Sequence, residues 1–313
     1  MNKLWFCLAV CVMNGLFTSS SYYFGASRLE HAYNVLQENN PEDWKCQPRR
    51  KLSPKLHAEA VRWSLVNSFL AGFVGTAIFM RHLNTGNLLK LYYDVNDHGW
   101  VGRFCDSSTA ILHTHTHLLT QSINQSSQST FSLKQVRFFR DVVLVYIWID
   151  IWAYTIHRFL HMKFIYKYIH KWHHRYVAPT AFTAFGMHPV EFLMLQMGGL
   201  SCCFLFEIHI MAFMANGVHI AYHGQVDHSG IDFEGDLPWQ PSVQFHDDHH
   251  RFFHVNFGQS FIVWDWLFGT LRQGNRKYGE DIFVGDCARS PQKKKSAMSS
   301  LVPSDTRTKK KLM

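Results

Sequence analysis

Eight histidines in three short clusters carry most of the chemistry that this sequence offers. The chain has 21 histidines among its 313 residues. The clusters read His157-x-x-x-His161, His170-x-x-His173-His174 and His246-x-x-His249-His250. Residues three and four positions apart share one face of a helix, so each cluster can direct two or three imidazole nitrogens at one point. Since a zinc ion takes about four ligands, eight nitrogens predict two metal ions held close together.

The type of donor limits the metal and its chemistry. Sites made only of nitrogen ligands suit zinc, copper, iron or nickel. The His-Glu-x-x-His motif of zinc proteases does not occur in the sequence. Two iron ions in a nitrogen-rich site can use O2 to break an unactivated C–H bond. That chemistry suits a membrane enzyme whose substrate is a lipid hydrocarbon.

Single residues near the clusters are further candidates. Asp150 precedes His157 by seven residues, which is two helical turns on the same face. A carboxylate in an apolar helix is costly and usually has a task. It can orient an imidazole or cap unrelated polar groups, and both interpretations stay open. His219 and His223 are four residues apart and are also candidates for the metal site.

Apolar segments place these clusters in a membrane protein. Hydrophobic residues make up 47% of the chain and charged residues only 17%. Apolar stretches run over residues 4–24, 61–80, 138–156 and 192–222, and the last is long enough for two tightly packed helices. Segments of about twenty apolar residues fit the thickness of a bilayer. We expect an all-α, multi-pass protein; the alternative is a soluble protein with buried helices.

The distribution of basic residues predicts the topology. The basic stretch 45–55 should remain in the cytosol, which requires residues 4–24 to be a retained spanning helix and not a cleaved signal peptide. Counting forward, the histidine clusters and the C-terminal tail are then cytosolic, although three basic residues within 134–140 become lumenal. The ending Lys310-Lys311-Leu312-Met313 is similar to the dilysine retrieval signal of endoplasmic reticulum membrane proteins. An ordinary lysine-rich tail is the alternative.

Charge and cysteine usage exclude other classes. Of the net charge of +8, most lies in residues 293–311, which hold seven basic residues and one acidic residue. The rest is close to neutral, so no nucleic-acid surface is indicated. The seven cysteines form no C-x-x-C pair, which supports neither a disulfide framework nor a cysteine metal site.

The chain divides into three parts. Residues 1–56 form an N-terminal membrane segment with a basic linker, residues 57–272 form the catalytic membrane domain, and residues 273–313 form a basic tail. The Ser/Thr/Gln-rich stretch 104–133 within the domain predicts a mobile loop, inserted as a polar segment.

Further short motifs occur before, between and after the clusters. They are Leu91-Tyr92-Tyr93-Asp94, Gly99-Trp100, His157-Arg158, Pro179-Thr180, His188-Pro189-x-Glu191, Asp227-His228-Ser229-Gly230, Asn256-Phe257-Gly258-Gln259 and Trp264-Asp265. With the clusters, this order resembles the fatty acid hydroxylase / sterol desaturase superfamily of membrane di-iron oxygenases. The resemblance covers about residues 54–272 and is densest over 150–270.

The resemblance implies a ligand set and a cofactor. It makes the eight cluster histidines iron ligands and adds His228. It also implies two iron ions, O2 as co-substrate, and electrons from an external donor, cytochrome b5 or its reductase. His188 is a weaker ligand candidate. It precedes a proline at a predicted helix start with Glu191 in the first turn, so both residues can equally serve the helix.

The resemblance also implies an oxidoreductase that hydroxylates or desaturates a lipid C–H bond, with sterol biosynthesis as the preferred setting. The stretch from Asn256 to Gln259 looks like sterol C5-desaturases, whereas His228-Ser229-Gly230 looks like C4-methylsterol oxidases. A sphingoid-base or fatty acyl hydroxylase is the alternative. Two alternatives come from other classes of protein. One is a non-catalytic lipid-binding relative, which would not need every cluster position. The other is a metal transporter, which would need ligands along a path through the membrane.

Overall fold

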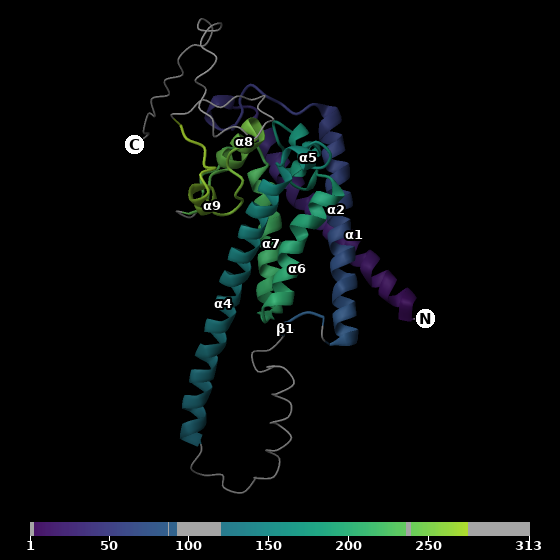
Figure 1. The fold of residues 1–313 in the computed structure, drawn as a ribbon, viewed down its shortest axis with the longest axis vertical. Coiled ribbons are helices and arrows are strands. Elements are labelled where there is room, and N and C mark those ends of the chain that lie inside the picture. Colours follow the sequence, from purple (N-terminus) through teal and green to yellow (C-terminus); the bar gives the residue numbers. More distant parts are fainter. Residues whose placement is uncertain (1–2, 87, 93–119, 236–238, 275–313) are drawn as a thin grey trace, which may run out of the picture.

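Five long helices form the body of the protein (Figure 1). The structure is a computed structural model that describes residues 3–86, 88–92, 120–235 and 239–274. The long helices are α1 (Lys3–Leu36), α2 (Pro54–Thr85), α4 (Thr120–Leu160), α6 (Pro189–Leu205) and α7 (Ile210–Asp227). The strands β1 (Leu91–Tyr92) and β2 (Ile208–His209) pair in parallel. The predicted all-α class is confirmed.

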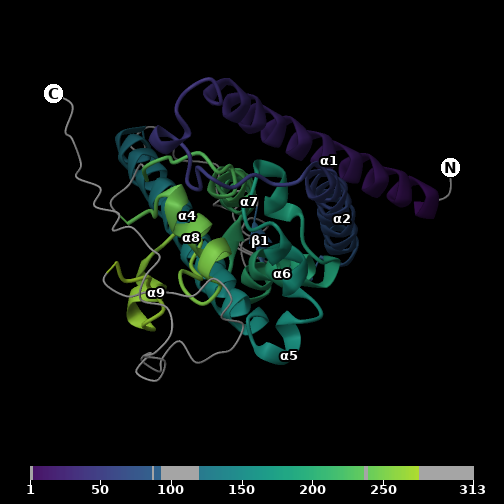
Figure 2. The same cartoon turned by 90° about the horizontal axis from the view of Figure 1, so that it is seen from above.

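The long helices form three groups that lie side by side. The α1–α2 pair lies on one side and α4 on the other, with α6 and α7 between them (Figures 1 and 2). Short elements gather at one end of this body, where the histidine clusters also lie. These elements are η1 (Pro41–Asp43), α5 (Lys163–Tyr166), η2 (His170–Arg175), η3 (Ala181–Phe185), α8 (Val243–Phe252) and α9 (Val263–Leu267). The clusters lie on η2, on α8 and at the end of α4.

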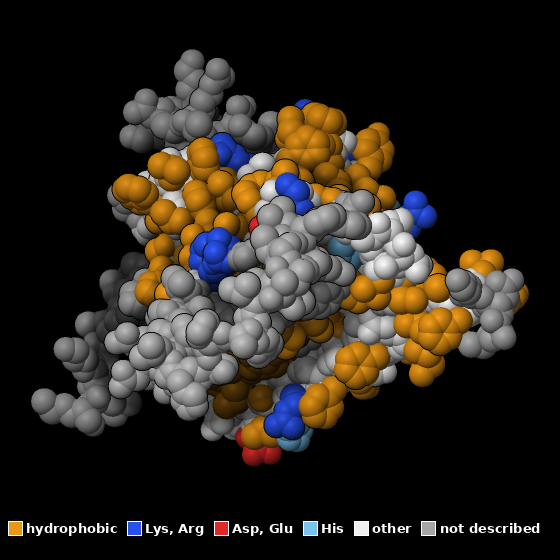
Figure 3. Space-filling view, turned by 90° about the horizontal axis from the view of Figure 1, so that it is seen from below, with side chains coloured by type: hydrophobic (Ala, Val, Ile, Leu, Met, Phe, Trp, Pro, Cys, Tyr) orange, Lys and Arg blue, Asp and Glu red, His pale blue; other side chains and the backbone are white. Residues whose placement is uncertain are grey.

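Within the part of the chain that the structure describes, three helices are long and apolar enough to cross a membrane, namely those over Leu4–Leu36, Pro54–Thr85 and Gln135–Leu160. These match three of the predicted apolar segments, and the fourth forms the predicted pair of helices, α6 and α7. Many large hydrophobic side chains on these helices are exposed, among them Phe17 and Phe139 at 68% and 65%. Seen from the end opposite to the histidines, the described surface is mostly hydrophobic with scattered charges (Figure 3). Such a surface is what lipid tails would cover.

Local sequence signals explain where the helices begin and end. Ser53 caps α2, because its side chain accepts a hydrogen bond from the Leu56 amide and Pro54 follows at the first helical position. Gly86 ends α2 in the left-handed region at φ 72°. His209 caps α7 by accepting from the Met211 amide.

The mobile loop predicted over residues 104–133 is wrong for its second half. Helix α4 begins at Thr120 and therefore includes residues 120–133. The segment contains no glycine or proline, and once an apolar helix is nucleated, helix can propagate into a polar neighbour at little cost. Residues 104–119 lie outside the described part of the chain, as do Asp94, the Gly99-Trp100 pair and the tail from residue 275 with its lysine ending.

Helices α1 and α2 approach closely through small and polar side chains. Asn14 donates to the Thr76 hydroxyl at 2.6 Å, and the Thr18 hydroxyl donates to the Ser68 carbonyl oxygen at 2.8 Å. Gly72 allows the contact, because a Cβ at this position would lie 2.2 Å from the Thr18 hydroxyl oxygen. Small residues and interhelical hydrogen bonds are typical of packed membrane helices. Helix α1 is thus an integral part of the fold.

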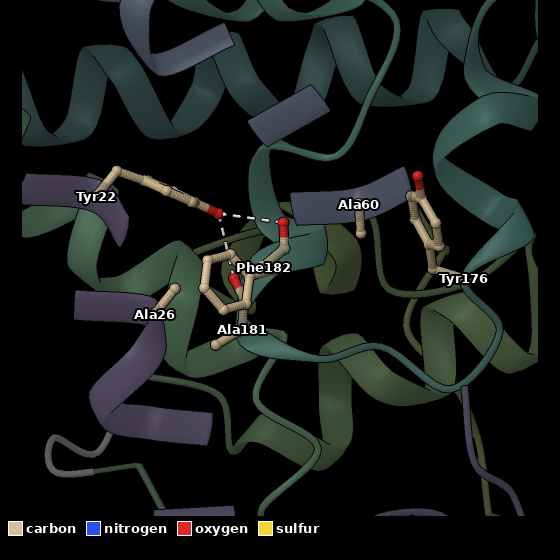
Figure 4. Packing of buried hydrophobic residues seen from close by; sticks show 6 residues of the cluster. All are labelled: Tyr22, Ala26, Ala60, Tyr176, Ala181 and Phe182. Atoms are coloured by element: carbon tan, nitrogen blue, oxygen red, sulfur yellow. Dashed lines mark hydrogen bonds between the residues drawn. The ribbon is translucent and has the colours of Figure 1, made fainter. Parts of the chain in front are cut away.

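A buried cluster ties α1 to the segment that follows the second histidine cluster. The Tyr22 hydroxyl group donates to the carbonyl oxygens of Ala181 and Phe182 at 3.2 and 3.3 Å (Figure 4). The same oxygen accepts from the Phe185 amide at 3.2 Å. All three groups belong to η3, which connects η2 to α6. Tyr22 therefore holds the chain between the histidines of η2 and Glu191 of α6.

Candidate metal centre

Nine histidines converge in two adjacent groups. In each group, one ring nitrogen of every member lies within 4.8 Å of those of the others. The five-histidine group consists of His157, His161, His170, His174 and His249. The four-histidine group consists of His173, His228, His246 and His250. The structure thus brings together all eight cluster histidines and His228, the residue that the family resemblance added.

Each cluster contributes to the site from a different element. His157 lies in the last turn of α4 and His161 just beyond it. The second cluster forms the 3-10 helix η2, and the third lies on α8. His228 follows the last residue of α7. The site therefore depends on four segments that are far apart in the sequence.

The spacing of nitrogens in the five-histidine group indicates more than four ligands per metal. The Nε2 atoms of His161, His170 and His174 form a triangle with sides of 3.0, 3.0 and 3.1 Å. With metal–nitrogen bonds of about 2.1 Å, two ligands at a right angle are about 3.0 Å apart and two at the tetrahedral angle about 3.4 Å apart. The observed triangle fits the right angle. This spacing, in a group that offers five nitrogens within 4.8 Å of one another, suits a five- or six-coordinate metal better than tetrahedral zinc.

The four-histidine group is fully buried and touches the first. The Nε2 atom of His228 lies 3.0 Å from that of His246 and 3.3 Å from that of His173. The rings of His174 and His250, one from each group, have centroids 5.0 Å apart. Two metal ions bound here would therefore be close neighbours.

The protonation of the imidazoles fits metal binding. Burial lowers the pKa of His170 to about 3 and that of His228 to about 4, so both are neutral near pH 7 and have a lone pair to donate. Among the described residues, neither nitrogen of His250 has a hydrogen-bond partner. Buried polar atoms without partners are costly. Metal ions would use these nitrogens, and the residues present fit them.

Backbone carbonyls orient several of the rings. His157 Nδ1 lies 2.8 Å from the Phe257 carbonyl oxygen, and His249 Nδ1 lies 2.7 Å from the Val255 carbonyl oxygen. Since a carbonyl oxygen only accepts, each Nδ1 is the protonated nitrogen. Nε2 then keeps its lone pair and faces the group.

The turn after α8 supplies these carbonyls and is strained. Phe253 adopts a φ of 65°, which is unfavourable for a bulky side chain, and Asn256 adopts 58°, in a region that asparagine tolerates better. The Asn256 side chain holds the turn, because it donates to the Phe245 carbonyl oxygen and accepts from the Arg272 amide. Strain of this kind is found at functional sites when the surroundings enforce it.

Two buried aspartates hold the segment that follows. Asp265 accepts from the Phe257 and Gly258 amides at 2.8 and 2.6 Å. Asp150 accepts from the Ser260 amide and the Trp264 indole at 2.8 and 2.7 Å. Asp150 therefore bonds to no ligand directly, and of its two open interpretations the structure favours capping of other polar groups. Its effect on His157 passes through the loop that carries the Phe257 carbonyl.

The remaining candidates lie outside both groups. His188 caps α6, since its Nδ1 accepts from the Val190 amide. The His219 ring packs on Tyr146, and His223 pairs with Asp227 at 3.4 Å. Glu191 differs from them, because its carboxylate contacts Nδ1 of His170 at 2.6 Å with both side chains 1% exposed.

Sequence reasoning missed the groups that orient the ligands. The carbonyls of Phe257 and Val255 have no residue-type signature that a sequence can reveal. The Trp264-Asp265 pair was noticed only as a motif, and its bonds to the loop were not foreseen. An acidic residue in an otherwise apolar segment, seven residues after Gly258 of the preceding motif, is the signal that could have indicated this role.

Comparisons with known proteins agree with the geometry. Residues 142–270 match the sequence model of the family described as fatty acid hydroxylase. Methylsterol monooxygenase 1 of Danio rerio is 38% identical over 134 residues, which are 41% of this chain and 46% of that protein. Lathosterol oxidase of Homo sapiens is 32% identical over 126 residues, 39% of this chain and 42% of that protein.

A sterol desaturase is similar over the same extent. Delta(7)-sterol 5(6)-desaturase ERG3A of Gibberella zeae is 32% identical over 123 residues, 39% of this chain and 35% of that protein. The chain thus spans less than half the length of these relatives. No solved structure matches. The predicted resemblance to the fatty acid hydroxylase / sterol desaturase superfamily is confirmed for the part of the chain that carries the histidines.

Proposed function

We propose that this chain is an O2-dependent, di-iron membrane oxidoreductase that hydroxylates or desaturates a C–H bond of a sterol. The observation that carries the proposal is the convergence of nine histidines, seven buried and two half-buried, into two adjacent groups at one end of an apolar helical body. The names of the similar proteins, which are methylsterol monooxygenase, lathosterol oxidase and a sterol desaturase, support the choice of a sterol.

The nine histidines are the proposed iron ligands. Right-angle spacing in the five-histidine group supports iron over tetrahedral zinc. When bound, the two irons supply the reduction of O2 and the removal of hydrogen from carbon. The surrounding residues position the imidazoles and exclude water.

The chain's own residues keep the imidazoles in place and the site dry. The Nδ1–H group of His157 donates to the Phe257 carbonyl, which fixes the ring and leaves Nε2 free. Aromatic side chains close the site. The ring centroids of Phe253 and His174 are 4.9 Å apart, and those of Phe257 and His249 are 5.4 Å apart. A dry site strengthens electrostatic contacts and limits side reactions with water.

We further propose that the histidine end faces the cytosol at the endoplasmic reticulum membrane. The basic stretch 45–55 belongs to the same end of the fold as the histidines, since the Cys46 amide donates to the Gly230 carbonyl oxygen and Gln47 donates to the Val177 carbonyl oxygen. Packing of α1 against α2 supports a retained first helix. A glycan on the sequon at Asn124 would report the lumenal side.

Electrons would come from a separate donor, cytochrome b5 or its reductase, because the sequence has no flavin or nicotinamide fingerprint. The division into residues 1–56, 57–272 and 273–313 also stays a prediction.

Product analysis tests the activity. The full chain is expressed in cells whose own sterol oxidation is blocked, and sterols are profiled by mass spectrometry. We expect a new hydroxylated or desaturated sterol, and no such product with His173→Ala, because this variant loses a proposed ligand but keeps the apolar helices. An unchanged sterol profile with a changed sphingoid base would instead indicate the alternative substrate class.

A further inference from the structure

The two histidine groups differ in how their outer nitrogens are held. In the five-histidine group, Nδ1 of three members faces an acceptor, which is a carbonyl for His157 and His249 and a carboxylate for His170. In the four-histidine group, only His228 has such an acceptor, the Gly224 carbonyl oxygen at 2.6 Å. Among the described residues, the Nδ1 atoms of His173, His246 and His250 have no partner.

The acceptor on His170 is the only acidic one in either group, counting the printed contacts of the described residues. Glu191 Oε1 lies 2.6 Å from His170 Nδ1, and both side chains are 1% exposed. An acid in the first turn of a helix ordinarily faces solvent and interacts with the helix dipole. Glu191 is instead turned into the protein, and its Oε2 has no hydrogen-bond partner among the described residues.

A carboxylate on the outer N–H group makes an imidazole a stronger metal ligand. It fixes the tautomer and the ring direction and raises the basicity of the coordinating nitrogen. Burial alone raises the pKa of the Glu191 carboxyl well above its usual value. When the carboxyl is ionised beside a bound cation, its negative charge attracts that cation more strongly than the same two charges would attract each other in water. A carbonyl oxygen, as on His228, fixes the tautomer but adds no net charge.

We propose that Glu191 is a positioning residue that makes the five-histidine group the tighter of two unequal metal sites, so that metal loads this group first. The inference rests on the proposed metal centre but not on lipid oxidation.

Each site is measured alone to test this order. His246→Ala/His250→Ala leaves the five-histidine group, and His161→Ala/His170→Ala/His174→Ala leaves the four-histidine group. The full chain is purified in detergent, stripped of metal and titrated with Co2+, whose visible absorption reports the ligand field. We expect the five-histidine group to bind at least about 10-fold more tightly, because supporting partners of this kind change affinity by about 10–100-fold.

Glu191→Gln, which keeps the shape but removes the charge, separates positioning from packing. It should weaken Co2+ binding about 10–100-fold in the five-histidine background and leave the four-histidine background unchanged. Asp141→Asn is the matched control. This carboxylate is equally buried, but it accepts from Tyr92 and the His209 amide and contacts no ligand histidine.

The outcomes are distinct. Equal affinities of the two groups, or equal weakening of both by Glu191→Gln, would overturn the inference while leaving the metal centre in place. No Co2+ binding by the unaltered chain would instead refute the metal centre itself. Circular dichroism of each variant checks that its helices are retained, and Glu191→Ala repeats the measurement if Glu191→Gln does not fold.

Discussion

Tyr22→Phe tests whether the first helix supports the metal centre. The substitution removes one oxygen and leaves the ring that packs in the cluster of Figure 4. The Tyr22 side chain is 6% exposed, and its hydroxyl group serves two carbonyl oxygens and one amide of η3. The Phe185 amide would be left without this partner, and an unsatisfied buried group costs about 1–3 kcal/mol.

We therefore expect a loss of about 2 kcal/mol in the free energy of unfolding. Scaling the usual entropy of unfolding to this chain length gives a midpoint lower by about 3 °C. The assay is thermal unfolding in detergent, followed by circular dichroism, with metal content measured on the same samples. Metal content should also fall, because η3 joins η2 to the helix that carries Glu191.

Tyr23→Phe is the matched control, since the neighbouring side chain is 49% exposed. It should change stability by less than about 0.5 kcal/mol. If both variants melt at the midpoint of the unaltered chain, Tyr22 does not hold η3 and the reasoning fails.

Three further predictions follow from the contacts around the site. Asp265→Ala should release the amides of Phe257 and Gly258, misplace the carbonyl that orients His157, and reduce bound iron measured by mass spectrometry; normal iron content would contradict this role. Gly258→Ala should also displace this loop and lower the melting midpoint, since the added Cβ would lie 2.6 Å from the Phe261 carbonyl oxygen. An unchanged melting midpoint would refute this expected clash. In metal-stripped protein, the free energy of unfolding should fall as the pH drops from about 6.5 towards 3. Burial lowers the pKa of His170 to about 3 in the folded protein, so the unfolded chain binds a proton at a higher pH than the folded one does. Denaturation at graded pH measures this, and a free energy of unfolding that does not change with pH would count against it.

The sequence predicted which histidines converge better than it predicted the groups that orient them. Histidines three and four residues apart do face the same site in the fold, although η2 is a 3-10 helix and not an α-helix. The division into two groups was not predictable, because His173 and His174 are neighbours in the chain yet belong to different groups. Only the packing of four separate segments decides which nitrogen meets which.

The errors of prediction have physical causes. Polarity predicts a loop over residues 120–133, but the segment has no glycine or proline and α4 extends through it. For Asp150 two interpretations were open, and its carboxylate accepts from the Ser260 amide of a loop that is distant in the sequence. Helical periodicity in the sequence does not reveal contacts with segments that are distant in the chain.

The content of metal per chain tests the central claim most directly. The full chain, expressed with iron and purified in detergent, is measured by inductively coupled plasma mass spectrometry beside the His246→Ala/His250→Ala variant. We predict about two irons per unaltered chain and about one in the variant, because each histidine group holds one ion. One zinc and no iron per chain, or equal iron in both proteins, would contradict a site built for two irons.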